Sequence, residues 1–487
     1  MSARARLALG ALALALGGCT MVGPDYHLPK WAVFNQPQAQ APFDAQANPK
    51  VSQAALPADW WQLYHEPLLD HLVQEALAKN TDVRLAYHNL RRAYESYQMA
   101  HHANEVEFGG KAASGRGQVS SEALGEHEQL PVMNLSSAVV GIGYQVDLFG
   151  KLKRAAEAAG AGAEASQAAL DAARISVVAQ VVGSYMDSCH ASEELEIAEH
   201  SLNIQERQLE VAQRLLAGGR GNEIDVARAQ AQTEALRAQL PPYEAKKASA
   251  LYALAALLGR TPGDLPAGVA ACKHAPQLAA ALPTGDGAAL LKRRPDIRAA
   301  ERELAAATAE IGVATAALYP EISLGANFGY TGMTEHMGSA ITREWALMPS
   351  ISWHIPTKVD HARIRATEAG ADAALARFDG VVLAALRETQ TLLSHYAHNL
   401  KRSQSLRQAR DAARAGAEYN RRLYREGRMP YLDSLDADRT LAEAEAALAA
   451  AQAQLSTDQV NLFLSLGGGW ENARDSAGQE PRPAAKH

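Results

Sequence analysis

The chain of 487 residues contains little of what a compact enzyme needs. Aromatic side chains make up only 6% of it, and the motifs GxSxG, HExxH, GxxxxGKS, GxxxxGKT and CxxC are all missing. These motifs supply the nucleophile, the zinc ligands, the phosphate cradle or the redox pair of common enzyme classes. We therefore predict that the chain is not an enzyme, that it holds no metal or cofactor, and that it does not hydrolyse a nucleotide itself.

A basic surplus is missing as well. Lys and Arg total 47 and Asp and Glu total 54, which gives a formal net charge of −7, so nucleic acid is not an expected partner. The histidine pairs His101/His102 and His395/His398 lie at exposed helical spacings, with no cysteine or acidic cluster beside them. Because zinc sites combine such ligands, these histidines are expected to be solvated rather than metal-bound.

Long apolar runs are confined to the N-terminus. Two arginines precede an apolar run that ends in the sequence LGGC at Cys19. This pattern is typical of a signal peptide, here residues 1–18, that closes on a lipobox. Cys19 is therefore predicted to be the first residue of the mature chain and to carry an N-acyl group (palmitate) and an S-diacylglycerol. An ordinary signal peptide with a chance cysteine is the alternative. The lack of Asp at position 20 argues against retention at the inner membrane.

Cysteine is scarce, with only two residues besides Cys19. Cys189 and Cys272 could pair in an oxidising compartment, but they fall in a predicted helix and a loop that are far apart in sequence. We interpret them as two unrelated small hydrophobic residues, and the sequence does not decide whether they are free.

The chain repeats itself at a spacing of about 210 residues. Each repeat, 59–265 and 266–470, is predicted to contain a helix, two β-strands and a long helix hairpin. Residues 19–58 are rich in Pro, Gln and Ala and are interpreted as an extended, lipid-anchored tether. The polar tail, 471–487, is expected to be disordered. Such a duplication favours two pseudo-equivalent units over a two-domain enzyme.

Four segments alternate apolar with polar or small residues, as a wall between lipid and water requires. A soluble half-buried sheet gives the same pattern. After Cys19 no apolar run reaches the roughly 20 residues of a membrane helix, so any passage through a bilayer is expected to be β. Four strands cannot close a barrel, whereas three copies give twelve strands and a lumen. The segments are 105–115, 136–148, 321–331 and 345–355.

Two stretches without proline, 151–216 and 361–426, predict very long helices. At 1.5 Å per residue each would reach on the order of 100 Å. The flanking helices are about half as long, so two stacked end to end match one long helix in a coiled-coil-like hairpin. Pro241-Pro242 should kink or break the helix that contains them. The expected flanking helices are 67–103, 222–258, 294–317 and 431–466.

Six motifs follow one another along the chain: Cys19 with Gly23-Pro24-Asp25-Tyr26, Trp60-Trp61, Tyr144-Gln145-Val146-Asp147-Leu148-Phe149-Gly150, Arg293-Arg294-Pro295-Asp296-Ile297, Leu318-Tyr319-Pro320 and Leu466-Gly467-Gly468-Gly469-Trp470. In these motifs the chain resembles the TolC-like outer-membrane efflux proteins, in particular the OprM-type lipoprotein branch. The resemblance implies an α+β membrane protein in which a trimeric twelve-stranded β-barrel, with four strands per chain, continues into a long α-helical periplasmic tunnel. The strand-to-helix junction departs from the family pattern at Ile355-Pro356-Thr357.

The turns between the long and the flanking helices hold the candidate functional residues. Asp433 and Asp436 are three apart and share one helical face, so in a three-fold assembly they would form two carboxylate rings that constrict the pore. They match the aperture aspartates of the family, although a helix N-cap and a first-turn acid are an alternative reading. The resemblance also implies an aperture latch of Tyr424 and Asp225. The family's latch arginine is Met429 here, and Arg428 beside it is a candidate substitute.

The function expected from these observations is that of an outer-membrane channel in a tripartite multidrug or small-molecule efflux system. The resemblance implies a homotrimer embedded in outer-membrane lipid of a Gram-negative cell, a periplasmic membrane-fusion adaptor and an inner-membrane pump. An outlet for secreted polypeptides and a lipid-anchored periplasmic coiled-coil scaffold are the alternatives. The sequence discloses neither the exported compounds nor the particular pump and adaptor.

Overall fold

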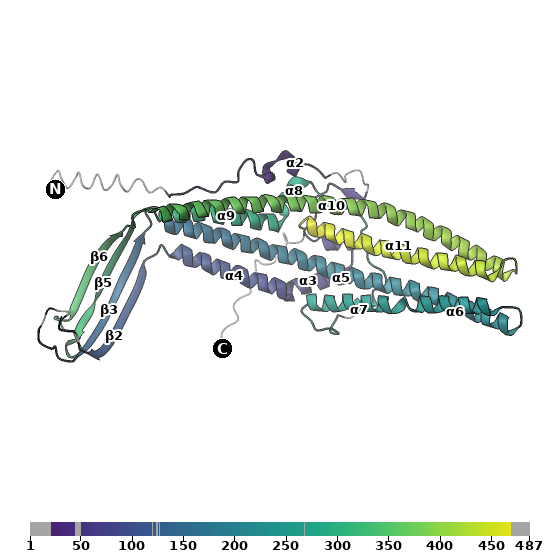
Figure 1. The fold of residues 1–487 in the computed structure, drawn as a ribbon, viewed down its shortest axis with the longest axis horizontal. Coiled ribbons are helices and arrows are strands. Elements are labelled where there is room, and N and C mark those ends of the chain that lie inside the picture. Colours follow the sequence, from purple (N-terminus) through teal and green to yellow (C-terminus); the bar gives the residue numbers. More distant parts are fainter. Residues whose placement is uncertain are drawn as a thin grey trace. The chain divides into compact units, whose positions relative to one another are not determined.

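The computed structural model describes residues 21–43, 50–118, 120–122, 125, 127–266 and 268–468 (Figure 1). The signal peptide, Cys19 and the C-terminal tail lie outside these residues. The chain forms two compact units. The sheet unit comprises Met1–Pro29, Leu90–Ser166 and Ala300–Phe378, and the helical unit comprises Lys30–Asn89, Gln167–Ala299 and Asp379–His487.

The sheet unit contains one antiparallel sheet in the order β2-β3-β5-β6 (Figure 1). Each repeat contributes one hairpin, and β3 pairs with β5 to join the two hairpins. All four strands predicted from the alternation are present, with ends shifted by a few residues. The first strand, β2, pairs with β3 along its whole length. The strands are β2 (Glu107–Gly117), β3 (Met133–Val146), β5 (Glu321–Met333) and β6 (Arg343–Ser352).

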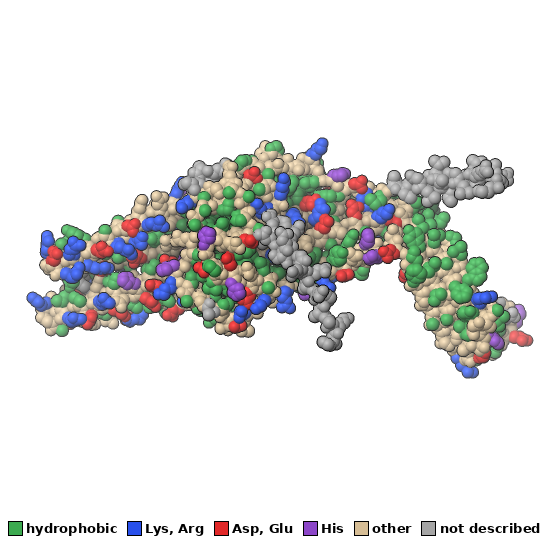
Figure 2. Space-filling model, turned by 180° about the vertical axis from the view of Figure 1, so that it is seen from behind, with side chains coloured by type: hydrophobic (Ala, Val, Ile, Leu, Met, Phe, Trp, Pro, Cys, Tyr) green, Lys and Arg blue, Asp and Glu red, His purple; other side chains and the backbone are tan. Residues whose placement is uncertain are grey.

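The two faces of this sheet differ in chemistry. Figure 2 shows hydrophobic side chains gathered over the sheet. On this apolar face, Phe108, Val140, Trp345 and Leu347 are between 61% and 78% exposed. Two successive rows across the four strands are Gly110, Val140, Phe328, Trp345 and Phe108, Ile142, Ala326, Leu347. Two rows of the opposite face are Gly109, Gly141, Asn327, Ala346 and Lys111, Val139, Gly329, Glu344. One face therefore suits lipid and the other suits water.

Two very long helices, α5 with 67 residues and α10 with 68, confirm the expectation from the proline-free stretches. In the helical unit each is followed by a helix that folds back beside it (Figure 1). Arg237 of α6 pairs with Glu206 of α5 at 2.8 Å, and Arg414 of α10 pairs with Glu445 of α11 at 2.8 Å. The main helices are α3 (Pro67–Lys79), α4 (Thr81–His102), α5 (Lys151–Ala217), α6 (Glu223–Arg237), α7 (Leu240–Leu257), α8 (Gly287–Arg293), α9 (Pro295–Ala316), α10 (Lys358–Arg425) and α11 (Tyr431–Ser465).

Among the described residues, no helix combines the length and the apolar character that crossing a bilayer requires.

The single helix expected over residues 67–103 is wrong, because the chain breaks it at Asn80. The Asn80 side-chain oxygen accepts hydrogen bonds from the backbone N–H groups of Asp82 (2.8 Å) and Val83 (3.2 Å), and so caps α4. Its amide nitrogen donates to the Leu257 carbonyl at the end of α7 (3.0 Å). The first backbone N–H groups of a helix have no acceptor within that helix, and an N-cap asparagine supplies one. In a continuous helix these N–H groups would already be bonded to the preceding turn. The break expected at Pro241-Pro242 is confirmed, since α6 ends at Arg237 and α7 begins at Leu240.

The predicted tether is not a free segment in its described part. Val51–Ser52 (β1) pairs in parallel with Leu282–Pro283 (β4) in the helical unit. Ala32, Phe43 and Leu56 are all buried, at 0%, 7% and 4% exposure. Their burial removes apolar surface from water, which stabilises the packed position of this segment over an extended one. The short helices of this segment are η1 (Val33–Asn35) and α2 (Pro37–Gln40), and η3 (Trp60–Tyr64) follows it at the start of the first repeat.

Cys189 and Cys272 form a disulfide, so their interpretation as unrelated hydrophobic residues is wrong. Cys189 lies in α5, and Cys272 follows the short helix η5 (Val269–Ala271). The loop after α7 returns alongside α5 and brings their Cα atoms within 5.0 Å, across 83 residues of sequence. A helix-to-loop contact of this range leaves no trace in local sequence periodicity.

Replacing both cysteines by serine should lower the free energy of unfolding by about 2–4 kcal/mol, because the crosslink restricts the unfolded chain. Denaturant unfolding of the purified protein with and without a reducing agent would measure the change. The wild type under reduction should match the double variant, and the double variant should not respond to the reductant. A wild type that does not respond to full reduction would contradict this expectation.

Candidate functional site: the turns of the two helix hairpins

The two hairpin turns share one backbone geometry. Gly219 after α5 and Gly427 after α10 both adopt left-handed conformations, with φ of 68° and 71°. In the first turn the Arg220 N–H donates to the Leu215 carbonyl (2.9 Å), and in the second the Arg428 N–H donates to the Leu423 carbonyl (2.9 Å). This is the Schellman closure of a helix C-terminus, which favours glycine at the left-handed position. The recurrence supports the two turns as equivalent points of the sequence repeat.

The N-terminal ends of the returning helices differ. The Asn222 side chain caps α6 by accepting from the Asp225 N–H at 2.8 Å. Pro430 stands at the corresponding position of α11 and supplies no side-chain cap. Asp433 therefore lies inside the first turn of α11, so its alternative interpretation as an N-cap is wrong. As a first-turn acid it still interacts favourably with the helix dipole.

Both predicted constriction residues have exposed side chains on α11. The Asp436 carboxylate accepts from Arg439 Nη2 at 2.8 Å, and both side chains of this ion pair are more than half exposed. The Asp433 backbone carbonyl accepts from the Asn420 side chain of α10 at 3.5 Å. A single chain thus presents two carboxylates at one hairpin end, and a ring would need further copies.

Two of the predicted latch residues have partners in their own turns. The Asp225 carboxylate accepts from the Asn222 amide at 2.7 Å, and Arg428 pairs with Glu426 at 3.3 Å. Tyr424 is half-buried on α10, and burial raises the pKa of its hydroxyl. The single chain therefore gives Asp225 and Arg428 local contacts, and their role as a latch stays a prediction.

The sequence analysis missed a buried carboxylate that joins the two hairpins. Asp438 of α11 is 8% exposed. Its Oδ1 accepts from Arg421 Nε of α10 at 2.7 Å, and its Oδ2 accepts from the Gln208 side chain of α5. Burial raises the pKa of the Asp438 carboxyl, against the opposing effect of Arg421 and Gln208. Asp438 thus links α5, α10 and α11 through one side chain.

A helical-face argument could have found Asp438. Two residues along a helix turn the side chain by roughly 200°. If Asp436 faces outward, Asp438 must face the neighbouring helices. A carboxylate on a buried helix face needs partners, and Arg421 and Gln208 are the partners that it has.

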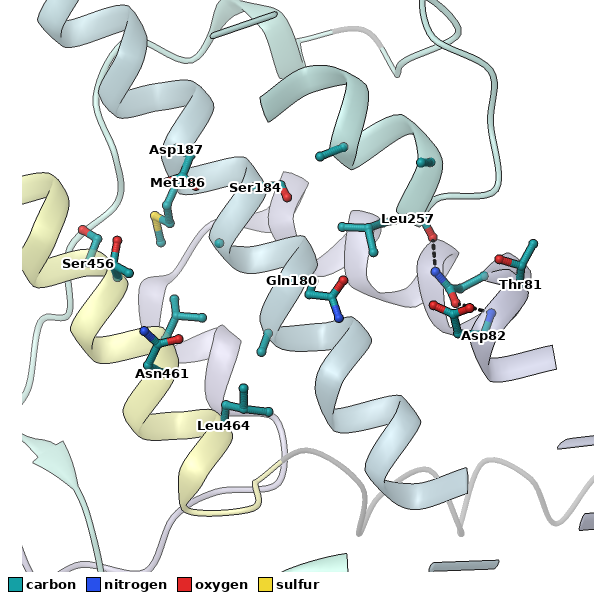
Figure 3. A pocket seen from close by; sticks show the side chains of 17 residues that line it. Thr81, Asp82, Gln180, Ser184, Met186, Asp187, Leu257, Ser456, Asn461 and Leu464 are labelled. Carbon is teal, nitrogen blue, oxygen red and sulfur yellow. Dashed lines mark hydrogen bonds between the residues drawn. The ribbon is translucent and has the colours of Figure 1, made fainter. Parts of the chain in front are cut away.

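Farther along the helical unit, α5 borders a hollow of about 560 Å³ that is lined by both polar and apolar side chains (Figure 3). Gln180, Ser184 and Asp187 line it from α5, Thr81 from the start of α4 and Asn461 from α11. Burial raises the pKa of Asp187 even though Lys246 opposes the shift. Within the described part of the chain, no group of three or more His, Cys, Asp or Glu residues is placed to hold a metal ion.

Comparisons with known proteins agree with this architecture. The family model described as "Outer membrane efflux protein" matches residues 72–260 and 288–468, one segment in each repeat. A probable efflux pump outer membrane protein, TtgC of Pseudomonas putida, is 31% identical over 97% of both chains. The solved outer-membrane channel OprN superposes with a TM-score of 0.84 at 34% identity, over 92% of this chain and 99% of its own. The open state of the Neisseria gonorrhoeae MtrE channel gives 0.80 at 27% identity, over 93% and 99%.

Proposed function

Because the chain belongs to the outer membrane efflux protein family and is an outer-membrane efflux channel, we propose that it is a passive exit duct gated at its periplasmic helix tips. Its fold class is that of the trimeric channels OprN and MtrE, with a helical periplasmic tunnel. The four strands per chain then supply twelve to the barrel. A lack of enzyme motifs is what we expect of a member of a family of transport channels.

The two-faced sheet supports the proposed path of solutes through the barrel. Its apolar face carries aromatic and aliphatic side chains, and its opposite face carries Lys111, Asn327 and Glu344 among small residues. Both edges, β2 and β6, have one unpaired side in the single chain. Since unpaired backbone groups are costly in lipid, neighbouring copies must pair with these edges. The polar face then lines the lumen.

The buried Asp438 is the observation that supports the gate. The side chain holds the α5–α6 hairpin to the α10–α11 hairpin, close to the turns where Asp433 and Asp436 are exposed. Separation of the hairpins would break the hydrogen bond between Asp438 and Gln208 of α5, while the bond to Arg421 stays within the α10–α11 hairpin. We infer that three copies of this contact, with the aspartate rings, keep the tip closed until a partner opens it. The solved structure of MtrE, whose fold this chain shares, is described as an open state.

The remaining parts of the proposal concern the assembly. Cys19 would carry the lipid that anchors the chain in the outer membrane. The homotrimer would receive small, mostly amphipathic compounds from an inner-membrane pump through a periplasmic adaptor, since the sequence has no nucleotide-binding motif of its own. The similarity to proteins named efflux pump components favours this role over a polypeptide outlet or a periplasmic scaffold.

Replacement of Asp438 by alanine tests the gate. The change removes the acceptor shared by Arg421 and Gln208, so the free energy of unfolding should fall by about 1–3 kcal/mol. The single-channel conductance in planar bilayers should rise, because the hairpins separate more readily. The matched control is Asp411→Ala, which removes an exposed carboxylate paired with Arg410 on α10. Folded Asp438→Ala trimers with wild-type conductance would refute the gate assignment.

A further inference from the structure

The proposed channel function does not explain why the charged side chain of Arg154 is buried in the sheet unit. The side chain of Arg154, in the first turn of α5, is only 2% exposed. Its guanidinium donates to the Asp25 carboxylate (2.7 Å) and to the Glu157 carboxylate (2.7 Å). It also donates to the backbone carbonyls of Val22 (3.2 Å) and Gly23 (3.3 Å). Three of these four acceptors belong to the N-terminal segment, two of them backbone carbonyls and one the Asp25 carboxylate, so Arg154 binds this segment rather than a neighbouring helix.

Two glycines let this segment approach the helices closely. Gly23 has a φ of +85°, and a Cβ there would lie 2.4 Å from the Gly312 Cα of α9. A Cβ on Gly312 would lie 2.7 Å from Arg154 Cγ. A side chain at position 23 would collide with the backbone of α9, and a side chain at position 312 would displace the Arg154 side chain. Glycine at positions 23 and 312 therefore lets the N-terminal segment, α9 and the Arg154 side chain pack this closely.

A third contact extends the bound segment to Tyr26. The Tyr26 hydroxyl donates to the Glu301 carboxylate of α9 at 2.6 Å. The Arg302 guanidinium carbon lies 5.7 Å from the centre of the Tyr26 ring, within the range of a cation–π interaction. We call residues 21–26 the N-terminal strap.

The strap begins at the end of the sheet from which α5 starts. The Val22 N–H donates to the Phe149 carbonyl at 3.2 Å. The Phe149 ring stacks on Tyr319 with a centroid distance of 4.5 Å. The Trp353 indole N–H donates to the Leu318 carbonyl at 3.1 Å. Three aromatic side chains thus gather where the strands end, and such girdles mark the membrane interface of β-barrels.

We propose that Arg154 is a positioning residue that fixes the acylated N-terminus at the headgroup level of the bilayer. The proposal rests on lipid attachment at Cys19. Two residues of extended chain span at most about 7 Å, so a lipid attached to Cys19 would be tied within this reach of Met21, the first residue of the strap. The ligand is the diacylglyceryl group of the chain's own N-terminus. Its glycerol backbone belongs at the level where aromatic residues meet the headgroups.

We call the contacts of Arg154 with the strap the clamp, and such a clamp would fix the depth of a barrel in the membrane. A lipid on a loose segment adds membrane affinity but does not define the depth of the protein. A lipid held next to the girdle resists displacement of the barrel along the membrane normal, because its buried methylene groups favour one depth. The clamp thus couples the position of the lipid to the position of the strands.

A nitroxide label at Met21→Cys in the full-length protein tests the clamp. In vesicles of phosphatidylethanolamine and phosphatidylglycerol, relaxation by oxygen and by a water-soluble nickel complex reports the depth of the label. The unaltered clamp should give an immobilised label at headgroup depth. Arg154→Gln should abolish the immobilised component and raise accessibility to nickel. The matched control is Lys153→Gln, which removes the neighbouring charge on the exposed side of the same helix turn.

A second variant covers the case in which Arg154→Gln does not fold. Asp25→Asn removes the charged partner of Arg154 from the strap, where its side chain is 72% exposed, and leaves α5 unchanged. It should also release the label. A label that stays immobilised at the same depth in both folded variants, or that lies in bulk water with the clamp intact, would overturn the proposal. Mass spectrometry of the N-terminal peptide tests lipid attachment separately from strap docking. An unmodified Cys19 would refute lipid attachment, whereas the mobility of the label would still report whether the strap is docked.

Discussion

Replacing Asp433 and Asp436 together by alanine should raise the single-channel conductance in planar bilayers and weaken the preference for cations. In the proposed trimer these side chains would supply six carboxylates at the narrow end of the helical tunnel. A pore lined by one sign of charge concentrates counter-ions by a factor of 10 or more. The double variant should therefore lose cation-to-anion selectivity by roughly ten-fold, and the smaller side chains should widen the constriction.

The control for this measurement is Glu443→Ala on the same helix. Glu443 is exposed and lies 3.9 Å from Arg439, the residue that also pairs with Asp436. Its removal changes the net charge of α11 without touching the predicted rings, so conductance and selectivity should stay at wild-type values. If the double aspartate variant forms trimers whose conductance and ion selectivity are unchanged, the two aspartates do not line the constriction.

A lysine at Gly110 should prevent stable assembly, whereas a lysine at Gly109 should be tolerated. These two residues are neighbours in sequence and lie on opposite faces of β2. A Cβ added at Gly109 would have no atom within 4 Å, and a Cβ added at Gly110 would lie 4.0 Å from the Val140 side chain. Both positions therefore have room for a side chain. Gly110 shares its row with Val140, Phe328 and Trp345 on the apolar face. A lysine facing lipid costs about 2–4 kcal/mol per chain near the bilayer centre.

Heat-modifiable trimers in outer-membrane fractions provide the readout for this pair. The Gly109→Lys protein should give trimers like the wild type, because Lys111 already occupies the same face of β2. The Gly110→Lys protein should be depleted from the membrane or run as monomer. Equal trimer yields from the two variants would mean that the apolar face does not contact lipid.

The long elements could be predicted from sequence because their signals are local and repeated. The proline-free stretches place α5 and α10 correctly, and the period-two alternation places all four strands. Each of these patterns follows from the chemistry of one segment alone. The same holds for the break at Pro241-Pro242, where the missing amide hydrogens act on the helix that contains them.

The features that escaped prediction depend on partners far away in sequence. Asn80 ends a helix because it also bonds to Leu257, and the Cys189–Cys272 pair depends on the return path of the loop after α7. Asp438 is recognisable as a buried acid only once Gln208 and Arg421 are beside it. The contacts of the N-terminal strap likewise join residues more than a hundred positions apart.

Inter-chain crosslinking tests the barrel most directly. With Gly109→Cys on β2, a second cysteine can be scanned along the same face of β6, at Glu344, Ala346, Met348 and Ser350. A closed ring in which β2 of each copy pairs with β6 of the next predicts that oxidation yields dimers and trimers and nothing larger. Absence of inter-chain crosslinks at every β6 position, or a ladder extending beyond three copies, would contradict the twelve-stranded channel.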